Sequence, residues 1–562
     1  MLNRMRTLSG ILSLGLSLVV SNSALAKDHF LTIGGGYSPS GNQVSLEKNV
    51  LFLQSVLAEK RPDRPRHEIY FADGDDAERD VHFRDPDFDK TVPPARRIMA
   101  EIFGEPESMD FVYRNHEIPN ETGPAEKELI EARFRQLANE LQSGDRLIVY
   151  ATGHGGEARG GRGGGRRRAG GGGRGRGNPY NTTLYMWGDE RVSASEFAGW
   201  LNDFRPDVTI VLVMVQCHAG GFAHSIFEQA TASQGLAPHA RCGFFSQVHD
   251  RAAAGCTPDV NEADYQEYSS FFWAALAGRT RAGAVLASVD YDKDGVVSFS
   301  EAHAYAVLAS DTIDIPIRTS DAFLREYSRA EGSTAGVVPP EPARGRRGGR
   351  GRGRGAQTEE QPAEPQPPQA VNSAPRVEGL LPFAGPMARL IEIARPDQRA
   401  ILEQLPARLG IRDGASVEDV RRRLEMANGE IAAARSKLSD ASQRYTDALD
   451  VVRDDVRRIW PELNSTYAPL AVALASERSE EFIARISALD SYRELREASA
   501  AQERATDARL DVDRTEAKVQ RLLRTCEDVV LAANLPKLAT PEIAARYEQL
   551  MKLESGVLAA SR

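Results

Sequence analysis

The sequence is short of cysteine, of basic charge and, after its first 26 residues, of long apolar runs. Only four cysteines stand among the 562 residues, so at most two disulfides can form within the chain. Acidic residues outnumber Lys and Arg by 80 to 70, and the net charge of −10 argues against a dedicated nucleic-acid binder. No stretch after residue 26 has the roughly 20 apolar residues that span a bilayer, so we expect a soluble product with no transmembrane segment.

The N-terminus has the pattern of a secretory signal. Arg4 and Arg6 precede an apolar run over residues 8–20, and Ala24-Leu25-Ala26 is a small-x-small cleavage site. Residues 1–26 are therefore predicted to be a signal peptide, and the mature chain is predicted to be periplasmic or secreted. An uncleaved N-terminal anchor is the alternative. An oxidising compartment favours disulfides, for which Cys242 and Cys256 are the local candidates, although sequence cannot fix the connectivity.

Residues 27–330 alternate short apolar runs with helical segments. Several of the runs are continuously apolar, as strands buried on both faces must be. The predicted strands cover residues 30–33, 68–72, 146–152, 208–215 and 243–248. The predicted helices cover residues 46–59, 125–142, 193–202, 219–232 and 265–277. This alternation predicts an α/β fold with a mostly parallel sheet flanked by helices.

Two low-complexity stretches interrupt this order. Residues 155–177 are an insertion of glycine and arginine, and residues 331–375 form a linker of similar composition with a Glu/Gln/Pro-rich end. Neither holds enough apolar surface to order itself. Residues 376–562 carry a heptad stripe over 417–452 and a second helical pattern over 479–532. Two such helices predict an all-α hairpin or coiled coil, suited to self-association or to binding a protein partner.

A histidine and a cysteine each follow a predicted strand. The strand 146–152 leads into Gly153-His154-Gly155, and the strand 208–215 leads into Gln216-Cys217. Neighbouring parallel strands end at one edge of a sheet, which would place His154 and Cys217 in one cleft. An imidazole there can take the thiol proton, so that the thiolate attacks a carbonyl.

The backbone around this pair has further predicted roles. The N–H groups of Gly155 and Cys217 are candidates for an oxyanion hole. A helix starting just after Cys217 would lower the pKa of the thiol.

These two blocks resemble a known superfamily. Thr152-Gly153-His154-Gly155 and Gln216-Cys217-His218-Ala219-Gly220 are similar to the histidine and cysteine blocks of the caspase, metacaspase and legumain peptidases, and most similar to those of bacterial metacaspase-like proteins. The resemblance covers about residues 28–310. It implies a caspase-hemoglobinase fold, a Cys/His dyad and hydrolysis of peptide bonds in a protein or peptide substrate through an acyl-enzyme.

The chain departs from the family pattern at several points. His154 and Cys217 are 63 positions apart, against about 50 in the caspase signature, and the Gly/Arg insertion accounts for the excess. Metacaspases commonly carry an Asp where this chain has Val215, which puts a preference for basic side chains in doubt. Asp250 and Glu267, beyond the next strand, are the candidates for lining the substrate pocket.

Residues 290–301 match the twelve-residue EF-hand loop. Gly295 stands at the sharp turn, and the flanks 282–288 and 302–308 are predicted helices. The loop predicts a Ca²⁺ site with a structural or activating role. Its predicted ligands are Asp290, Asp292, Asp294, the carbonyl of Val296, Ser298 and Glu301.

The sequence is also compatible with other functions. The same fold could serve as a catalytically inactive scaffold that binds partners through its C-terminal helices. A peptide ligase would share the nucleophile and resolve the acyl-enzyme with an amine. The Arg/Gly tracts could bind nucleic acid by phosphate contacts, although the acidic balance of the chain opposes it. The 155–177 insertion, next to His154, is also a candidate gate and self-cleavage site.

Overall fold

The computed structural model describes residues 27–104, 109–158, 178–331, 377–463, 465 and 468–558. The predicted signal peptide, most of the 155–177 insertion and almost all of the 331–375 linker lie outside the described residues. Within the described ranges, no helix combines the length and the apolar character needed to cross a bilayer.

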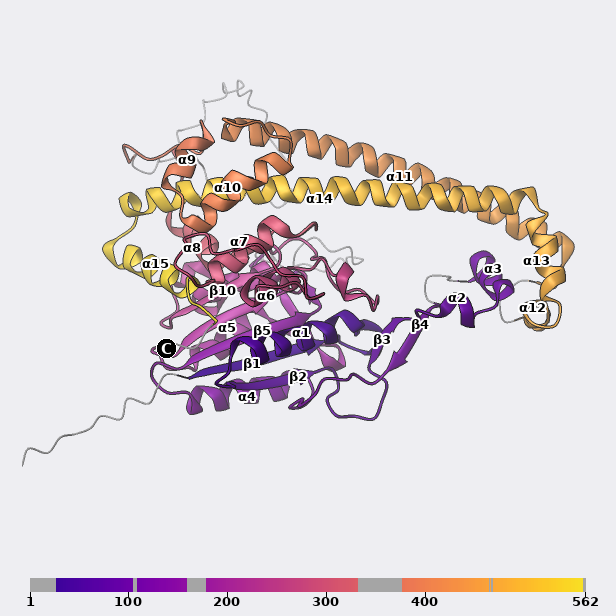
Figure 1. The fold of residues 1–562 in the computed structure, drawn as a ribbon, viewed down its shortest axis with the longest axis horizontal. Coiled ribbons are helices and arrows are strands. Elements are labelled where there is room, and N and C mark those ends of the chain that lie inside the picture. The colour runs from indigo at the N-terminus through magenta and orange to yellow at the C-terminus, as the bar shows by residue number, and fades with distance from the viewer. Residues whose placement is uncertain are drawn as a thin grey trace, which may run out of the picture.

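A six-stranded sheet forms the centre of residues 27–331 (Figure 1). Its order is β11-β10-β9-β5-β1-β2; the strands from β10 to β2 in this order run parallel, and β11 is antiparallel to β10 at the edge. The five parallel strands confirm the five that the sequence predicted, whereas β11 is too short to give a sequence pattern. The strands are β1 (Asp28–Gly35), β2 (Arg66–Phe71), β5 (Arg146–Gly153), β9 (Thr209–Met214), β10 (Arg241–Phe245) and β11 (Ile317–Arg318).

Helices cover both faces of this sheet. Successive residues of a strand point to opposite faces, and apolar strand residues are buried on each face. On one face, Val149 and Leu212 pack with α4 (Lys127–Glu140) and α5 (Ala194–Asn202). On the other face, alternate strand residues pack with α1 (Val44–Lys60), α6 (Tyr268–Ala277) and α7 (Phe299–Ala309). Two small antiparallel ribbons stand beside the sheet. They are formed by β3 (Val81–Arg84) with β4 (Phe111–Arg114), and by β6 (Gly155–Gly156), β7 (Thr183–Met186) and β8 (Glu190–Ser193).

Two predicted helices are wrong. Residues 219–226 form a 3₁₀ segment, and the chain beyond them turns repeatedly in place of continuing as a helix to residue 232. The reason is close packing: a Cβ at Gly220 would lie 2.7 Å from the carbonyl oxygen of Gln247. Residues 282–288 form a turn, in which Gly283 has a φ of +85°, and contain no helix.

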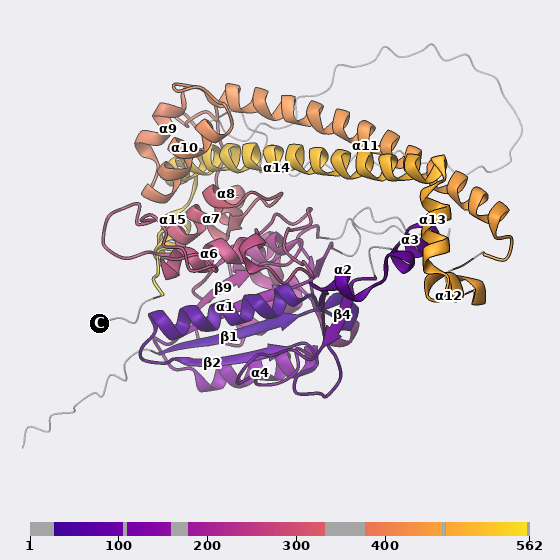
Figure 2. The same ribbon diagram turned by 45° about the vertical axis from the view of Figure 1, so that its right-hand side comes forward.

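The C-terminal region is a long helical hairpin, as predicted. The residues with the heptad repeat form α11 (Val417–Ile459). The second predicted helical segment forms α13 (Ser479–Ser487) and α14 (Asp490–Leu538). The two long helices lie side by side (Figures 1 and 2). Shorter helices complete the region: α9 (Met387–Ile393), α10 (Pro396–Arg408), α12 (Pro469–Ala475) and α15 (Pro541–Glu554).

This hairpin is joined to the α/β part at two places. Near the sheet, α15 packs through Tyr547 and Leu550 onto the same apolar cluster as α6 and α7, and α14 contacts α8 (Thr319–Tyr327). At the far tip, α12 and α13 pack on α3 (Pro94–Phe103), which follows the short α2 (Phe88–Thr91) in an arm between β3 and β4 (Figure 2). The C-terminal helices therefore share core with the α/β part and are not a loosely tethered module.

Candidate functional site

The ends of β5 and β9 lie side by side at the carboxyl edge of the sheet. The two strands are parallel neighbours, and Ala151 pairs with Met214. His154 and Cys217 each follow within three residues of that pair. The sequence-based prediction that both blocks emerge at one edge is confirmed.

Gly155 brings the backbone after His154 against the backbone of Cys217. A Cβ at residue 155 would overlap the carbonyl oxygen of Cys217 and would lie 2.7 Å from the Cγ of Gln216. Only glycine fits at this position, because any side chain would push the two strand ends apart. The segment after His154 can therefore contact the segment around Cys217 only if residue 155 is glycine.

The His154 ring is held by the segment between β1 and α1. Its Nε2 lies 2.8 Å from the carbonyl oxygen of Gly41 and 2.9 Å from Oε1 of Gln43, and Tyr37 packs edge-on at 5.4 Å. A carbonyl oxygen can only accept, so Nε2 carries the hydrogen and Nδ1 keeps its lone pair in the neutral ring. Burial lowers the pKa of His154 below its ordinary value of 6.5. The ring is therefore set up as a base at neutral pH.

The Cys217 thiol is half-buried and contacts the loop that follows β10. It accepts a hydrogen bond from the N–H of Ala253 at 3.3 Å, and Sγ lies 3.8 Å from the oxygen of Ala253. Among the described residues, the thiol makes no hydrogen bond to His154. Catalytic hydrogen bonds are often long without substrate and tighten when it binds.

The expected helix dipole at Cys217 is absent. His218 has a left-handed φ of +60°, and a 3₁₀ segment follows it in place of an α-helix. Burial raises the pKa of the Cys217 thiol above its ordinary value of 9.0, and the nearby Asp314 adds to the rise. The resting pair is a neutral thiol and a neutral imidazole, and the predicted lowering of the thiol pKa by a helix is wrong.

These opposite shifts predict the pH dependence of the site. Because the pKa of His154 lies below 6.5, we expect any reaction that uses this ring as a base to slow on the acid side only below that pH. Because the thiol pKa lies above 9.0, alkylation of Cys217 by iodoacetamide should still be accelerating at pH 9. A flat alkylation rate between pH 5 and 8 would indicate a thiolate–imidazolium pair and contradict this assignment.

The backbone N–H of Cys217 donates to no other residue in the described part of the chain, whereas the N–H of the next residue, His218, donates to the oxygen of Arg251 at 3.0 Å. Gly155, the other predicted donor, lies against the Cys217 carbonyl and pairs with Leu184 in the β6–β7 ribbon. Both N–H groups are thus placed at the strand ends, and their role as an oxyanion hole stays a prediction.

The two predicted pocket residues differ in their surroundings. Asp250 is exposed. Glu267 is buried and lies under the loop beside Cys217, because a Cβ at Gly255 would be 2.9 Å from its Oε2. Its Oε1 pairs with Arg281 at 3.2 Å, which neutralises the carboxylate. Neither residue is an unpaired buried acid.

Asp314 is a buried acid near Cys217 that the sequence did not reveal. Its Oδ1 accepts from the N–H of Ala254 at 2.7 Å, and its buried Oδ2 has no partner among the described residues. Burial raises the pKa of Asp314 to about 7. An Asp between a helix and a two-residue strand looks like an ordinary turn residue, so no local pattern could have identified it.

The predicted disulfide is not formed. All four cysteines are free, including Cys242 and Cys256. Cys242 is fully buried near the start of β10, whereas Cys256 lies in the exposed loop with its Sγ 3.9 Å from the oxygen of Gly153 at the end of β5. The two thiols thus belong to opposite ends of the parallel strands, which sequence spacing alone could not show.

The predicted calcium loop adopts a compact turn. The carboxylates of Asp290, Asp292 and Asp294 lie within 4.8 Å of one another, and the N–H of Gly295 donates to Asp290 Oδ2 at 3.0 Å. Gly295 has a φ of +92°, which explains the glycine.

The last residue of this loop, Glu301, belongs to the capping box at the start of α7. Glu301 Oε1 accepts from the N–H of Tyr291 at 2.6 Å, while Oε2 accepts from the N–H and Oγ of Ser298, both at 2.9 Å, at the start of α7. Val296 is exposed beside the three aspartates. The loop thus gathers acidic oxygens that could hold a cation, and its use by Ca²⁺ stays a prediction.

Comparisons with known proteins add little. No family model matches the chain, and no curated protein matches it. Among solved structures, a Geobacter sulfurreducens protein is similar at 10% identity and a TM-score of 0.26, over 50% of this chain and 88% of that one. A structural similarity this low identifies neither a fold family nor a function for this chain. By its own topology, the chain is an α/β protein with a mostly parallel six-stranded sheet and a C-terminal helical region.

Proposed function

We propose that this chain is an exported cysteine endopeptidase of the caspase-like type, with His154 as the base and Cys217 as the nucleophile. The observation that carries the proposal is the contact at Gly155, which sets the histidine block against the cysteine block at one sheet edge. The mostly parallel sheet covered by helices supports the proposal at the level of α/β architecture.

The chemistry follows from the protonation states of the pair. Nδ1 of His154 takes the thiol proton as Sγ of Cys217 attacks the carbonyl carbon of the scissile peptide bond. The N–H groups of Gly155 and Cys217 stabilise the negative oxygen of the tetrahedral intermediate. The imidazolium then gives its proton to the leaving amine, and water hydrolyses the thioester to release the acid and restore the thiol.

A peptide-library cleavage assay on the full chain tests this function. We expect the wild-type protein to cut a subset of the peptides. The masses of the two fragments should add up to the mass of the peptide plus one water, as hydrolysis requires. Products joined to a second peptide would indicate a ligase. Absence of turnover with every peptide, together with an intact Cys217, would favour an inactive scaffold and contradict the proposal.

We propose in addition that the loop 290–301 binds Ca²⁺. At about 100 times its Kd, a ligand that binds only the folded state adds about 2.7 kcal/mol of stability. We therefore expect millimolar Ca²⁺ to raise the apparent Tm of the wild-type protein, and Asp290→Asn to abolish the shift. Asp264→Asn, at an exposed site outside the loop, is the control and should keep it. An equal Ca²⁺ shift in Asp290→Asn would argue against this site.

A further inference from the structure

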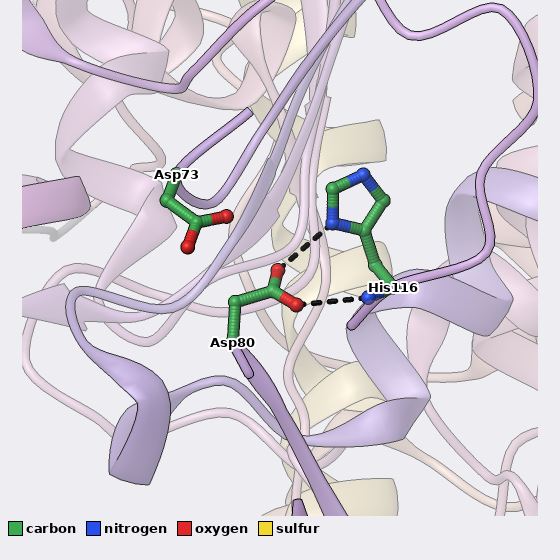
Figure 3. A group of neighbouring side chains, drawn as sticks. All are labelled: Asp73, Asp80 and His116. Carbon is green, nitrogen blue, oxygen red and sulfur yellow. Dashed lines mark hydrogen bonds and ion pairs between the residues drawn. The ribbon is translucent and has the colours of Figure 1, made fainter. Parts of the chain in front are cut away.

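A second group of metal-ligating side chains stands at the same edge of the sheet, on the far side of β1. Asp73 and Asp80 lie at the two ends of the segment between β2 and β3, and His116 follows β4, so two segments bring the three side chains together (Figure 3). One ligand atom from each of the three lies within 4.8 Å of the others. No sequence motif marks this group, because its members are scattered over more than 40 residues.

Two of the three side chains in this group, those of Asp80 and His116, are almost fully buried. The side chain of Asp80 is 0% exposed and that of His116 is 8% exposed. Asp80 is satisfied, since its Oδ2 lies 2.9 Å from His116 Nδ1 and its Oδ1 accepts from the His116 N–H at 2.8 Å. Asp73 is not: its Oδ1 is buried without a hydrogen-bond partner among the described residues, and its carboxylate points toward the other two side chains (Figure 3). Asp73 as a whole is half-buried, and its unpartnered oxygen stands beside a second carboxylate, an arrangement that a bound cation would stabilise.

The outer side of the His116 ring is already fixed. Nε2 lies 2.7 Å from Oε2 of Glu121, whose side chain is 9% exposed and whose Oε1 is buried without a partner in the described ranges. Metal-bound histidines usually donate their second ring N–H to a carboxylate in this way. Glu121 thus holds the hydrogen on Nε2, and Nδ1, which shares its proton with Asp80 Oδ2, is the nitrogen that a metal ion would bind once that proton is displaced.

We propose that Asp73, Asp80 and His116 bind a divalent first-row transition metal, with Zn²⁺ as the preferred ion. One imidazole nitrogen and two carboxylates suit Zn²⁺, whereas Ca²⁺ needs six or more oxygens and Mg²⁺ keeps several waters. The metal takes the place of the proton on His116 Nδ1 and supplies the charge that Asp73 lacks.

The site also reaches the segment that holds His154. The amide Nδ2 of Asn42 donates to Asp80 Oδ2 at 3.4 Å, and its Oδ1 accepts from the N–H of Gly36 at 3.0 Å. The preceding residue, Gly41, supplies the oxygen that fixes the His154 ring. A cation bound to Asp80 therefore ties β2, β3 and β4 to the segment 36–43.

Titration of the metal-stripped full chain with Zn²⁺ in a calorimeter tests the site without any peptidase assay. We expect one equivalent to bind the wild type, and Asp73→Asn, which keeps the shape of the side chain, to weaken the Kd at least tenfold. Asp76→Asn in the same turn, where the side chain is exposed, and Asp290→Asn in the calcium loop are the matched controls and should bind as the wild type does.

Co²⁺ provides a second readout that does not depend on stability. Visible absorption bands of Co²⁺ in a nitrogen and oxygen site should appear in the wild type and be lost in His116→Gln, with circular dichroism confirming that the variant is folded. If His116→Gln does not fold, Asp73→Asn is used in its place. Zn²⁺ binding of equal affinity in the wild type and in Asp73→Asn, or no binding at micromolar Zn²⁺, would overturn the proposal.

Discussion

Replacing Cys217 by alanine is expected to lower kcat/KM for peptide cleavage by about 10⁴-fold or more, because the acyl-enzyme cannot form without the thiol. The loss should appear in kcat, since the substrate-binding surface is unchanged. Cys217→Ala removes one sulfur atom from a half-buried site, so its far-UV circular dichroism and apparent Tm should stay close to those of the wild type.

Cys256→Ala is the matched control for this experiment. Cys256 lies in the same loop region, and its Sγ is 3.9 Å from the oxygen of Gly153, at the end of the strand that carries His154. It has no role in the proposed chemistry, and its variant should keep activity within a few-fold of the wild type. If activity survives in Cys217→Ala and disappears in Cys256→Ala, the nucleophile has been misassigned.

Replacing Arg521 by methionine is expected to lower the free energy of unfolding by about 4 kcal/mol, because several buried acceptors would lose their donor at once. Arg521 lies on α14 and is 2% exposed. Its guanidinium donates to the backbone oxygens of Val307, Ser310, Thr312 and Asp314, at distances of 2.7–3.0 Å. The C-terminal hairpin thus fixes the segment that carries Asp314.

The change should also reach the candidate active site. Asp314 holds the N–H of Ala254, and Ala253 contacts the Cys217 thiol, so a loosened 307–314 segment should reduce kcat even in the folded variant. Arg514→Met on the same helix is the control, because the Arg514 side chain is partly exposed and its ion pair within the described residues is with Asp511 on the same helix. Denaturant midpoints report stability, and equal midpoints for the two variants would show that the 307–314 segment does not depend on α14.

The sequence predicted the parts of the fold that rest on local pattern. Several of the five parallel strands are continuous apolar runs, and the heptad stripe from Val417 gives a helix that begins at a capping box between Ser416 and Asp419. The positions of His154 and Cys217 followed from the strands that precede them. These features are visible because neighbouring residues alone determine them.

What the sequence missed depends on contacts between distant segments. The expected helix after Cys217 fails because Gly220 must pass close to the backbone of residues 247–249. Asp314 contacts a loop that is distant in sequence, and Asp73 lies near His116, which follows β4, so no local pattern identifies either residue. The docking of α15 on the sheet is equally invisible, because Tyr547 and Leu550 read as an ordinary amphipathic face.

The most direct test of the central claim is intact and peptide mass spectrometry after reaction with a peptidyl electrophile such as an acyloxymethyl ketone. The account predicts a single adduct on Cys217, formed at least tenfold more slowly in His154→Ala because Nδ1 no longer takes the thiol proton. Labelling of Cys217 at the same rate in the wild type and in His154→Ala, or labelling confined to Cys256, would contradict it.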